Sequence, residues 1–270
     1  MPEQETFQLQ GDAPQIYEEQ CVPALFRPLA ELTLRHVDVS EGARVIDVAC
    51  GTGIVGRLVA EKVGRSGKVV GIDLNEGMIE AARRYSPVTG ANVAWRTGDV
   101  SALPFSDASF DIAFCQQGLQ FFPDKLAALK EMRRVLAPGG TIILTVWSAV
   151  SPLSAVVADA LVRYVSAEAA RSALAPFAFR DPEVIMALMV EADFQEIKME
   201  TLVVERRIGP AEESIPMVMA GTSYANEVAK LDTATMEALV TDASNALQQY
   251  RDDNGLSIPQ QTHLVRATVW

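Results

Sequence analysis

Short apolar runs alternate with amphipathic stretches through the first half of the chain. The apolar runs that read as strands are 45–49, 68–73, 93–100, 112–115 and 141–147. Between them, apolar residues recur at helical spacing, most clearly over 57–63 and 126–136 and from residue 74 onward, where Asn75 is expected as the N-cap. Repeated strand–helix units with short connections are typical of a parallel, doubly wound sheet, in which ligands bind at the carboxyl ends of the strands.

The pattern changes after Trp147. Helices are predicted over 154–166 and 182–192, with Asp181 as an N-cap, and a looser helical stretch over 169–179. A sixth strand is expected at 193–199, with 202–208 continuing it or pairing with it. Residues 210–255 look helical again, and 263–270 reads as a last strand, antiparallel beside the sixth. N-terminal residues 14–38 are also expected to be helical.

The most specific motif lies between the first two strands. Gly51-x-Gly53-x-x-Gly56 follows the first strand, and Asp73 ends the second. Glycines let the backbone turn sharply and approach a ligand, and the helix that follows begins with free N–H groups. An acid at the tip of the second strand is placed to accept both hydroxyls of a ribose. The motif therefore predicts a nucleoside-bearing cofactor.

The glycine spacing alone also fits a dinucleotide, so the cofactor is decided by neighbouring residues. Asp47 lies within the first strand, a few residues before the glycines. A carboxylate there repels a pyrophosphate and favours a cationic amino-acid group. An NAD(P)-dependent oxidoreductase stays open as an alternative, although no proton donor such as Tyr-x-x-x-Lys is recognisable.

With Asp-Val-Ala-Cys-Gly-Thr-Gly at the turn, the chain resembles the class I S-adenosylmethionine-dependent methyltransferases. It is most similar to their small-molecule branch (methyltransferase type 11), which includes the ubiquinone and menaquinone biosynthesis enzymes. The connector 103–111 and the run Arg134-Val135-Leu136-x-Pro138-Gly139-Gly140 also match that family. The resemblance covers about 40–147 strongly and implies S-adenosyl-L-methionine as the cofactor.

The resemblance also implies which residues bind the cofactor. Asp47 and the glycine turn would hold its methionine end, and Asp73 its ribose. Asp99 and the Val100 N–H are placed to bond the adenine, although an acid after a strand is often only a turn former. Leu74 and Met78 would flank the nucleoside, or equally belong to the core. The expected cofactor-binding residues are Tyr17, Phe26, Asp47, Ala49, Gly51, Thr52, Gly53, Asp73, Leu74, Met78, Gly98, Asp99, Val100 and Gln116.

The segment after the fourth strand points to the substrate. Residues 116–124 lack the Asn- or Asp-Pro-Pro-aromatic tetrapeptide with which enzymes of this fold grip an amine, and carry glutamines beside aromatics instead. We expect Gln120 and Phe121 to face a less polar organic substrate, although Phe121 and Phe122 would equally serve to cap the core. His36 and His263 are expected to be structural, and Cys50 and Cys115 to be small buried hydrophobes. No catalytic residue is identified.

The predicted organisation is a mostly parallel, seven-stranded α/β sheet with an antiparallel last strand. Segment 1–40 is expected to be helical and to close over the cofactor, and 41–148 to form the cofactor-binding core. The remainder, 149–270, would complete the sheet and add helical lid insertions, at about 150–180 and 210–255, that roof the substrate site. Their apolar residues suggest a moderately hydrophobic substrate; they are Phe177, Phe179, Met186, Met189, Met217 and Met219.

Composition and charge limit the classes of partner and of binding site to expect. The net charge is −12, from 35 acids against 23 bases, which disfavours a nucleic acid partner. No apolar run approaches the roughly 20 residues that span a bilayer, and the polar, acidic N-terminus is no secretory signal, so a cytoplasmic protein is expected. Three separated cysteines and two histidines predict neither a metal site nor a disulfide framework. The oligomeric state stays open, a homodimer being one option.

The function expected from these features is S-adenosylmethionine-dependent methyl transfer to a small, moderately hydrophobic organic molecule. Methyl transfer from a sulfonium is an in-line displacement with a good leaving group, so alignment can supply much of the rate. Oxygen, nitrogen, carbon and sulfur all remain open as the methylated atom. The alternative of another class is a non-catalytic S-adenosylmethionine- or S-adenosylhomocysteine-binding protein, whose cofactor motifs would look the same.

Overall fold

The computed structural model describes residues 11, 13–86, 89–220, 222 and 224–270. The chain divides into two compact units, each made of separate stretches of sequence. Unit 1 comprises 1–146, 180–202 and 262–270, and unit 2 comprises 147–179 and 203–261. The segments predicted as lid insertions lie largely within unit 2, and their placement over a substrate stays a prediction. Segment 180–202, which includes Met186 and Met189, instead returns to unit 1.

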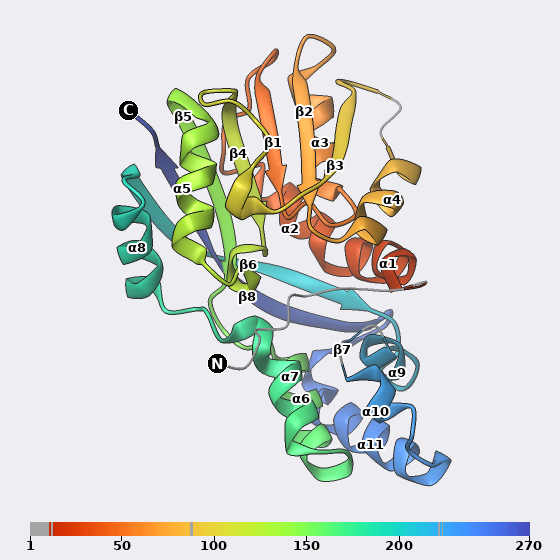
Figure 1. Ribbon diagram of the computed structural model, residues 1–270. Helices are drawn as coiled ribbons and strands as arrows, with labels where there is room; N and C mark the ends of the chain where they lie inside the picture. The colour runs from red at the N-terminus through yellow and green to blue at the C-terminus, as the bar shows by residue number, and fades with distance from the viewer. Residues whose placement is uncertain (1–10, 12, 87–88, 221, 223) are drawn as a thin grey trace. The chain divides into compact units, whose positions relative to one another are not determined.

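Five parallel strands form the sheet of unit 1. They are β1 (Arg44–Val48), β2 (Lys68–Asp73), β3 (Val93–Thr97), β4 (Phe110–Gln116) and β5 (Leu136–Trp147). Strand β1 pairs with β2 on one side and with β4 on the other, while β3 and β5 extend the sheet outward. The chain order therefore reverses between β1 and β4. Figure 1 shows α3 behind these strands and α5 in front of them, as a doubly wound sheet requires.

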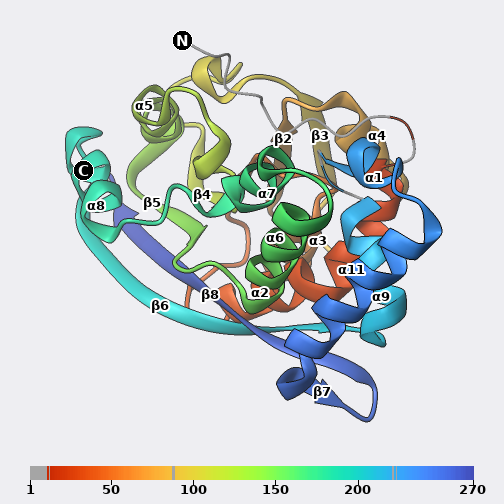
Figure 2. The same ribbon diagram turned by 90° about the horizontal axis from the view of Figure 1, so that it is seen from below.

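Two long strands complete the sheet, β6 (Gln195–Ile208) and β8 (Gly255–Thr268), in the order β3-β2-β1-β4-β5-β8-β6. They run side by side (Figure 2). Strand β8 is antiparallel to β5, because the Gly139 N–H donates to the Val269 carbonyl and the Val269 N–H donates to the Gly140 carbonyl. The two-residue strand β7 (Arg251–Asp252) pairs with β8. The predicted mostly parallel sheet with an antiparallel last strand is confirmed, with β7 as an additional short strand.

Helices of unit 1 are α1 (Ala13–Ile16), the π-helix η1 (Tyr17–Phe26), α2 (Arg27–Thr33), α3 (Ile54–Val63), α4 (Glu76–Arg84), the 3-10 turns η2 (Val100–Ala102) and η3 (Leu119–Phe121), α5 (Lys125–Val135) and α8 (Pro182–Glu191). Asn75 caps α4 by accepting from the Met78 N–H, and Asp181 caps α8, as predicted. None of the described helices is long and apolar enough to cross a bilayer.

Unit 2 is helical around its own core. Its helices are α6 (Pro152–Tyr164), α7 (Ala167–Leu174), η4 (Ala175–Phe177), α9 (Ala211–Ala220), α10 (Ala225–Val228), α11 (Thr233–Ala246) and η5 (Gln248–Tyr250). Leu161, Ile215 and Leu239, from three of these helices, are completely buried in one hydrophobic cluster. Met219 belongs to the same cluster, so this side chain, predicted to contribute to the roof, packs inside unit 2.

Several predicted boundaries were wrong. The last strand begins at Gly255, eight residues before the predicted start, because Leu256, Ile258 and Gln260 alternate inward although one of them is polar. Helix α3 begins at Ile54 rather than Arg57. The third strand ends at Thr97, where the chain turns into η2. Strand β5 begins at Leu136 rather than Thr141, and its register with β4 shifts between these residues, where 137–140 lie opposite the single residue Asp111.

The packing of the Trp95 ring explains why positions 53 and 71, near the carboxyl ends of the strands, are glycines. It lies beside Gly71 in the register of β3 with β2. A Cβ at Gly71 would come within 2.3 Å of its ring, as would a Cβ at Gly53. The indole N–H donates to Ser86 Oγ at 2.8 Å, which fixes the ring over both glycines. Gly53 is therefore constrained by packing as well as by its positive φ of 88°.

We expect Gly71→Ala to lower the free energy of unfolding by about 1–3 kcal/mol, because the added methyl group overpacks against the indole. Equilibrium unfolding in urea measures the change. The control is the Gly71→Ala/Trp95→Leu double variant, in which Gly71→Ala should cost clearly less than in the parent chain. Equal costs in the two backgrounds would contradict the packing explanation.

Candidate functional site

The predicted site residues gather where the order of the strands reverses. The turn after β1 and the segment after β4 meet there, since a Cβ at Gly118 would lie 2.7 Å from the Ala49 Cβ. Ala49 and Gln117 both adopt a positive φ, 54° and 55°, a conformation that costs free energy in residues other than glycine. In open α/β sheets the crevice at such a reversal is the ordinary place for a ligand.

Asp73 joins the tips of β1 and β2. One carboxylate oxygen accepts from the Gly51 N–H at 2.8 Å, and the other from the Asn75 N–H at 2.9 Å. Burial raises the pKa of this carboxyl, and the backbone N–H groups of Asn75, Gly51 and Leu74 partly oppose that rise. The Asp73 side chain is thus fixed against the glycine turn, at the place where the sequence predicted it.

Asp47 lies beneath the same turn. Its side chain is 1% exposed, and one oxygen accepts from the Gly56 N–H in the first turn of α3 at 2.9 Å. Burial raises the pKa of Asp47 to about 7, while the Gly56 N–H and the Arg57 charge lower it and Asp73 raises it further. A buried carboxyl group, Asp47, and a half-buried one, Asp73, therefore lie on either side of one short turn, and each accepts from a backbone N–H of that turn or of α3.

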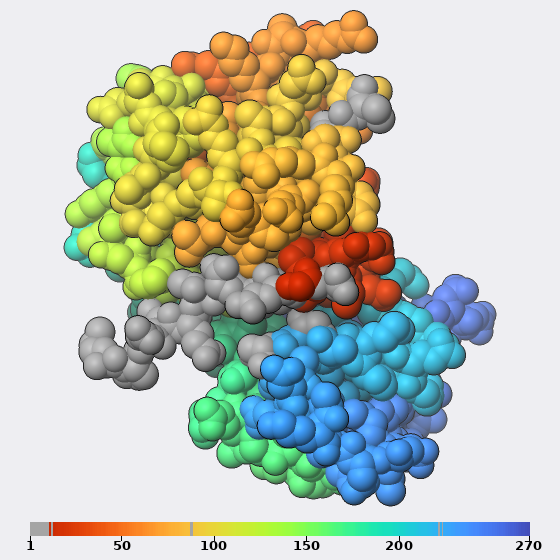
Figure 3. Space-filling view, turned by 45° about the vertical axis from the view of Figure 1, so that its right-hand side comes forward, coloured from red at the N-terminus to blue at the C-terminus, as the bar shows by residue number. Residues whose placement is uncertain are grey.

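The N-terminal helical segment contacts the turn through an aromatic ring. Tyr17 and Phe26 stack with ring centroids 5.1 Å apart, and the Tyr17 ring lies 4.0 Å from a Cβ built on Gly51. Burial raises the pKa of the Tyr17 hydroxyl, and the nearby Asp73 charge raises it further. Figure 3 shows the start of this segment, in red, at the surface beside the orange residues of α4, against which α1 packs.

A buried ion pair that the sequence analysis missed holds this segment to α3. Arg57 donates to the Glu18 carboxylate and to the Thr52 carbonyl, both at 2.6 Å, and each charged side chain is about 10% exposed. The available signal was an arginine within the otherwise apolar first turns of α3. Its acidic partner, 39 residues earlier, carries no pattern that a sequence reveals.

The residues that follow β2 and β3 differ in their contacts near Asp73 and in their exposure. The Gly98 N–H donates to the Asp73 carbonyl at 2.9 Å, which places the end of β3 beside Asp73. Asp99 is exposed and caps η2 by accepting from the Ser101 N–H at 2.8 Å. Asp99 therefore forms the turn that begins η2. Contacts of Asp99 and Val100 with an adenine stay predictions. Leu74 is 47% exposed, whereas Met78 is buried.

Glutamines after β4 form a hydrogen-bonded chain. Gln120 Nε2 donates to Gln117 Oε1, and Gln117 Nε2 donates to Thr262 Oγ1, both at 3.0 Å; Thr262 in turn donates to the Val146 carbonyl. Gln116 Nε2 donates to the Phe26 carbonyl at 3.2 Å. Sequence reasoning named Gln116 and Gln120 but missed Gln117, although the three occur within five residues. It also missed Thr262, which fell just before the predicted last strand.

Both histidines have hydrogen-bond partners within the protein. His36 Nδ1 is bonded to the Leu32 carbonyl at 2.9 Å, and His263 contacts the Arg180 carbonyl and Thr201 Oγ1. Burial raises the pKa of the Cys115 thiol to about 12 and raises that of Cys50 as well. Both thiols are buried and protonated at neutral pH, which agrees with their prediction as small hydrophobes.

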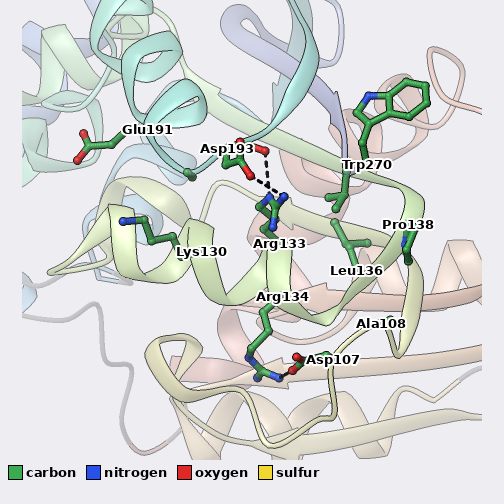
Figure 4. A pocket seen from close by; sticks show the side chains of 12 residues that line it. Asp107, Ala108, Lys130, Arg133, Arg134, Leu136, Pro138, Glu191, Asp193 and Trp270 are labelled. Carbon is green, nitrogen blue, oxygen red and sulfur yellow. Dashed lines mark hydrogen bonds and ion pairs between the residues drawn. The ribbon is translucent and has the colours of Figure 1, made fainter.

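A hollow of about 490 Å³ lies at the amino edge of the sheet, near the first residues of β4 and β5 (Figure 4). Two of its cations are neutralised within it, since Arg133 pairs with Asp193 at 2.6 Å and Arg134 with Asp107 at 2.8 Å. None of the predicted site residues lines this hollow. The candidate site is therefore at the carboxyl edge, around Asp47, Asp73 and Gln116.

Comparison with known proteins finds methyltransferases. Residues 45–140, from β1 into β5, match the family model of the methyltransferase domain. The chain is 41% identical over 110 residues to demethylmenaquinone methyltransferase of Staphylococcus aureus, a match that covers 41% of this chain and 45% of that protein. The chain thus matches about half the length of the curated relatives. These matches confirm the resemblance to class I methyltransferases related to quinone biosynthesis.

Solved structures share the fold. A SAM-dependent methyltransferase of Thermotoga maritima is 21% identical, with a TM-score of 0.56 over 95% of this chain and 96% of its own. Phosphoethanolamine N-methyltransferase 2 of Haemonchus contortus, solved with phosphomonomethylethanolamine and S-adenosylhomocysteine, is 20% identical, with a TM-score of 0.53 over 91% of this chain and 52% of its own. At these identities the likeness shows the fold alone.

The raised pKa of Asp47 predicts how stability depends on pH. The folded chain retains a proton up to about pH 7, whereas the unfolded chain releases it near the ordinary value of 3.8. The contribution of Asp47 to the free energy of unfolding therefore falls as pH rises between these values, and levels off above pH 7. Asp47→Asn keeps an acceptor for the Gly56 N–H but cannot titrate.

Urea unfolding of both proteins from about pH 4 to pH 8 measures this contribution as the difference between their free energies of unfolding. Relative to Asp47→Asn, the parent chain should lose stability across that interval. The other titrating groups, Asp73 included, are present in both proteins and largely cancel. Parallel pH profiles would show that Asp47 has an ordinary pKa in the folded chain.

Proposed function

We propose that this chain transfers a methyl group from S-adenosyl-L-methionine to a small, moderately hydrophobic organic acceptor. The proposal is supported by the methyltransferase-domain match at 45–140 and by the site at the reversal of strand order. The observation that carries it is the pair of carboxyl groups at one glycine turn, Asp47 buried and Asp73 half-buried, both with a raised pKa.

The charge at this turn selects between the two cofactor classes that the glycine spacing allows. The diphosphate of a nicotinamide dinucleotide would bring negative charge against one buried and one half-buried carboxyl group, where the reduced dielectric strengthens repulsion. S-adenosylmethionine instead carries a positive sulfonium and a positive amino group, and supplies an activated methyl group. A cation at the turn would stabilise the ionised form of Asp47, whose pKa is raised to about 7 by burial.

The side chains present at the turn fit such a cofactor. Asp73 is fixed by two backbone N–H groups, and its carboxylate oxygens can each accept a further bond from a ribose hydroxyl. Thr52 Oγ1 is buried at the turn with no hydrogen-bond partner among the described residues, so it offers a polar group to a ligand. Tyr17 and Phe26 would cover the turn and exclude water from it. The roles of these and the other expected cofactor residues are part of the proposal.

The segment after β4 supports an acceptor that needs orientation rather than deprotonation. Residues 116–123 contain three glutamines and two phenylalanines, and no titratable side chain. The Gln120–Gln117–Thr262 chain fixes the amide of Gln120, which we propose orients the acceptor beside Phe121. A quinol-like ring fits this combination of amide and aromatic groups, and a curated relative is named a demethylmenaquinone methyltransferase.

Calorimetric titration with S-adenosylmethionine and S-adenosylhomocysteine, beside NADH, tests the cofactor. We expect micromolar binding of the two sulfur nucleosides, weakened about tenfold or more by Asp73→Ala because the ribose hydroxyls lose a charged acceptor. Asp107→Ala is the matched control, since Asp107 is an exposed aspartate at the opposite edge of the sheet. Binding of NADH alone would restore the dinucleotide interpretation of Gly51, Gly53 and Gly56.

A panel of phenols, amines, thiols and quinols, incubated with methyl-labelled S-adenosylmethionine, tests the transfer itself. Labelled product with any of them establishes the enzyme, and the class that reacts identifies the acceptor atom. Cofactor binding without transfer across the panel would favour the non-catalytic binding protein instead.

A further inference from the structure

The N-terminal helical segment changes its type of helix in the middle. Residues 13–33 are helical without interruption; η1, at 17–26, is π-helical, and the stretches on either side are α-helical. In a π-helix each N–H bonds to the carbonyl five residues earlier, and the Arg27 N–H donates to the Val22 carbonyl in this way. π-helical turns are rare and mostly occur singly, frequently at functional sites. Two such turns in succession therefore point to a role.

The local sequence favours these wide turns. Pro23 lies inside η1, and in an α-helix its ring would clash with the carbonyl of Glu19. Three side chains of η1 pack in one hydrophobic cluster at a spacing of five and four residues, rather than the three and four of an α-helix; they are Tyr17, Val22 and Phe26. Between them, Glu19, Gln20 and Pro23 are exposed. Each wide turn thus contains one exposed residue more than a turn of α-helix needs.

The width of the turns decides the direction of two aromatic side chains. Tyr17 and Phe26 are nine residues apart, which in an α-helix is about two and a half turns and places them on opposite sides. A π-helix has about 4.4 residues per turn, so the same nine residues make close to two full turns. The two rings therefore lie on one side of the segment, where they stack with centroids 5.1 Å apart.

The side of the segment that carries both rings faces the glycine turn. The Tyr17 ring lies 4.0 Å from a Cβ built on Gly51, and Glu18 accepts from Arg57 of α3 at 2.6 Å. With α-helical geometry at the same length, a segment that keeps Phe26 in place would point Tyr17 to the opposite side. The type of helix therefore decides whether Tyr17 reaches the glycine turn.

We propose that η1 is a positioning element of the candidate site. Its two wide turns set the angle between Tyr17 and Phe26 so that both rings cover the glycine turn. The residues that supply the extra width, one in each turn, are Glu19 and Pro23; both are exposed, and Glu19 accepts a hydrogen bond from Gln15 in the same segment. They act through the two rings and not by contact with a ligand. The contact of the rings with a cofactor rests on the proposed function, whereas their alignment by the helix type does not.

Removing one exposed residue from each wide turn tests this inference. In a chain that lacks Glu19 and Pro23, Tyr17 and Phe26 are seven residues apart, which is about two turns of α-helix. Seven residues of α-helix extend about 10.5 Å, and nine residues of π-helix, which rises less per residue, cover a similar length. This double-deletion variant can therefore form a continuous α-helix and keep both rings on the same side.

Insertion of one alanine between Glu19 and Gln20 is the matched control at the same exposed surface. It makes the separation of the two rings ten residues, which is about 2.8 turns of α-helix or about 2.3 turns of π-helix. Any mixture of the two helix types lies between these values, so whole turns cannot align Tyr17 with Phe26. The smaller change in length should therefore be the more harmful one.

Urea unfolding compares the two variants without any ligand. The double deletion should keep the folding equilibrium constant within about threefold of the parent chain, as for a change at an exposed surface, or raise it. The insertion should lower the constant about tenfold or more, because it separates the stacked rings and the nine-tenths buried Glu18–Arg57 pair. A double deletion at least as destabilising as the insertion would overturn the inference. Should the insertion variant not fold, the double deletion and its crystal structure still decide.

A crystal structure of the double-deletion variant and a calorimetric titration complete the test. The structure should show α-helix throughout this stretch with the Tyr17 and Phe26 rings still stacked, and rings on opposite sides would contradict the inference. Affinity for S-adenosylhomocysteine should stay within about threefold of the parent chain after the double deletion and fall about tenfold or more after the insertion. If the parent chain binds neither sulfur nucleoside, the proposed function fails, while the unfolding and crystal comparisons still decide whether the helix type aligns the rings.

Discussion

The hydrogen bond from the Gly51 N–H to the Asp73 carboxylate is the constraint around which the candidate site is arranged. It joins the tips of two neighbouring parallel strands and directs a half-buried carboxylate at the turn between β1 and α3. Asp47 accepts from the Gly56 N–H below the same turn, so the turn is held by carboxylates from two sides. Burial makes both groups costly to ionise, and that cost is what a cationic ligand would relieve.

Close packing also restricts which residues fit at and beside the glycine turn. The Trp95 indole lies against Gly53 and Gly71 where neither position has room for a Cβ. On the other side, Gly118 contacts Ala49 and lets the segment after β4 approach the turn. Ala49 and Gln117 accept positive φ values at this contact. Glycines that look dedicated to a ligand in the sequence thus also have neighbours in the protein that exclude a side chain.

Buried polar contacts attach the N-terminal segment to the glycine turn and to α3. The Arg57–Glu18 pair is about nine-tenths buried, and breaking such a pair leaves an uncompensated charge. The Phe26 carbonyl accepts a hydrogen bond from Gln116 Nε2, which joins the same segment to β4. Tyr17 is thereby held against Gly51, as its proposed role in covering the turn requires.

Local patterns in the sequence determined the parallel half of the sheet and the residues that follow its strands. Apolar runs and glycine turns are short-range signals, so β2 was predicted with correct bounds, and Asn75 and Asp181 were correctly predicted as caps. The site residues after β1, β2 and β4 could be named because parallel strands bring their carboxyl ends to one edge.

Only the tertiary structure decided which distant residues complete the site. Glu18 with Arg57 and Gln117 with Thr262 are hydrogen-bonded pairs whose members are 39 and 145 residues apart in the sequence. Their side chains are polar and buried, a combination that carries no periodic signal. The early start of β8 was missed for a related reason, since Gln260 and Thr262 point inward without being apolar. Such groups are placed by the partners that satisfy them, and those partners are close only in the folded chain.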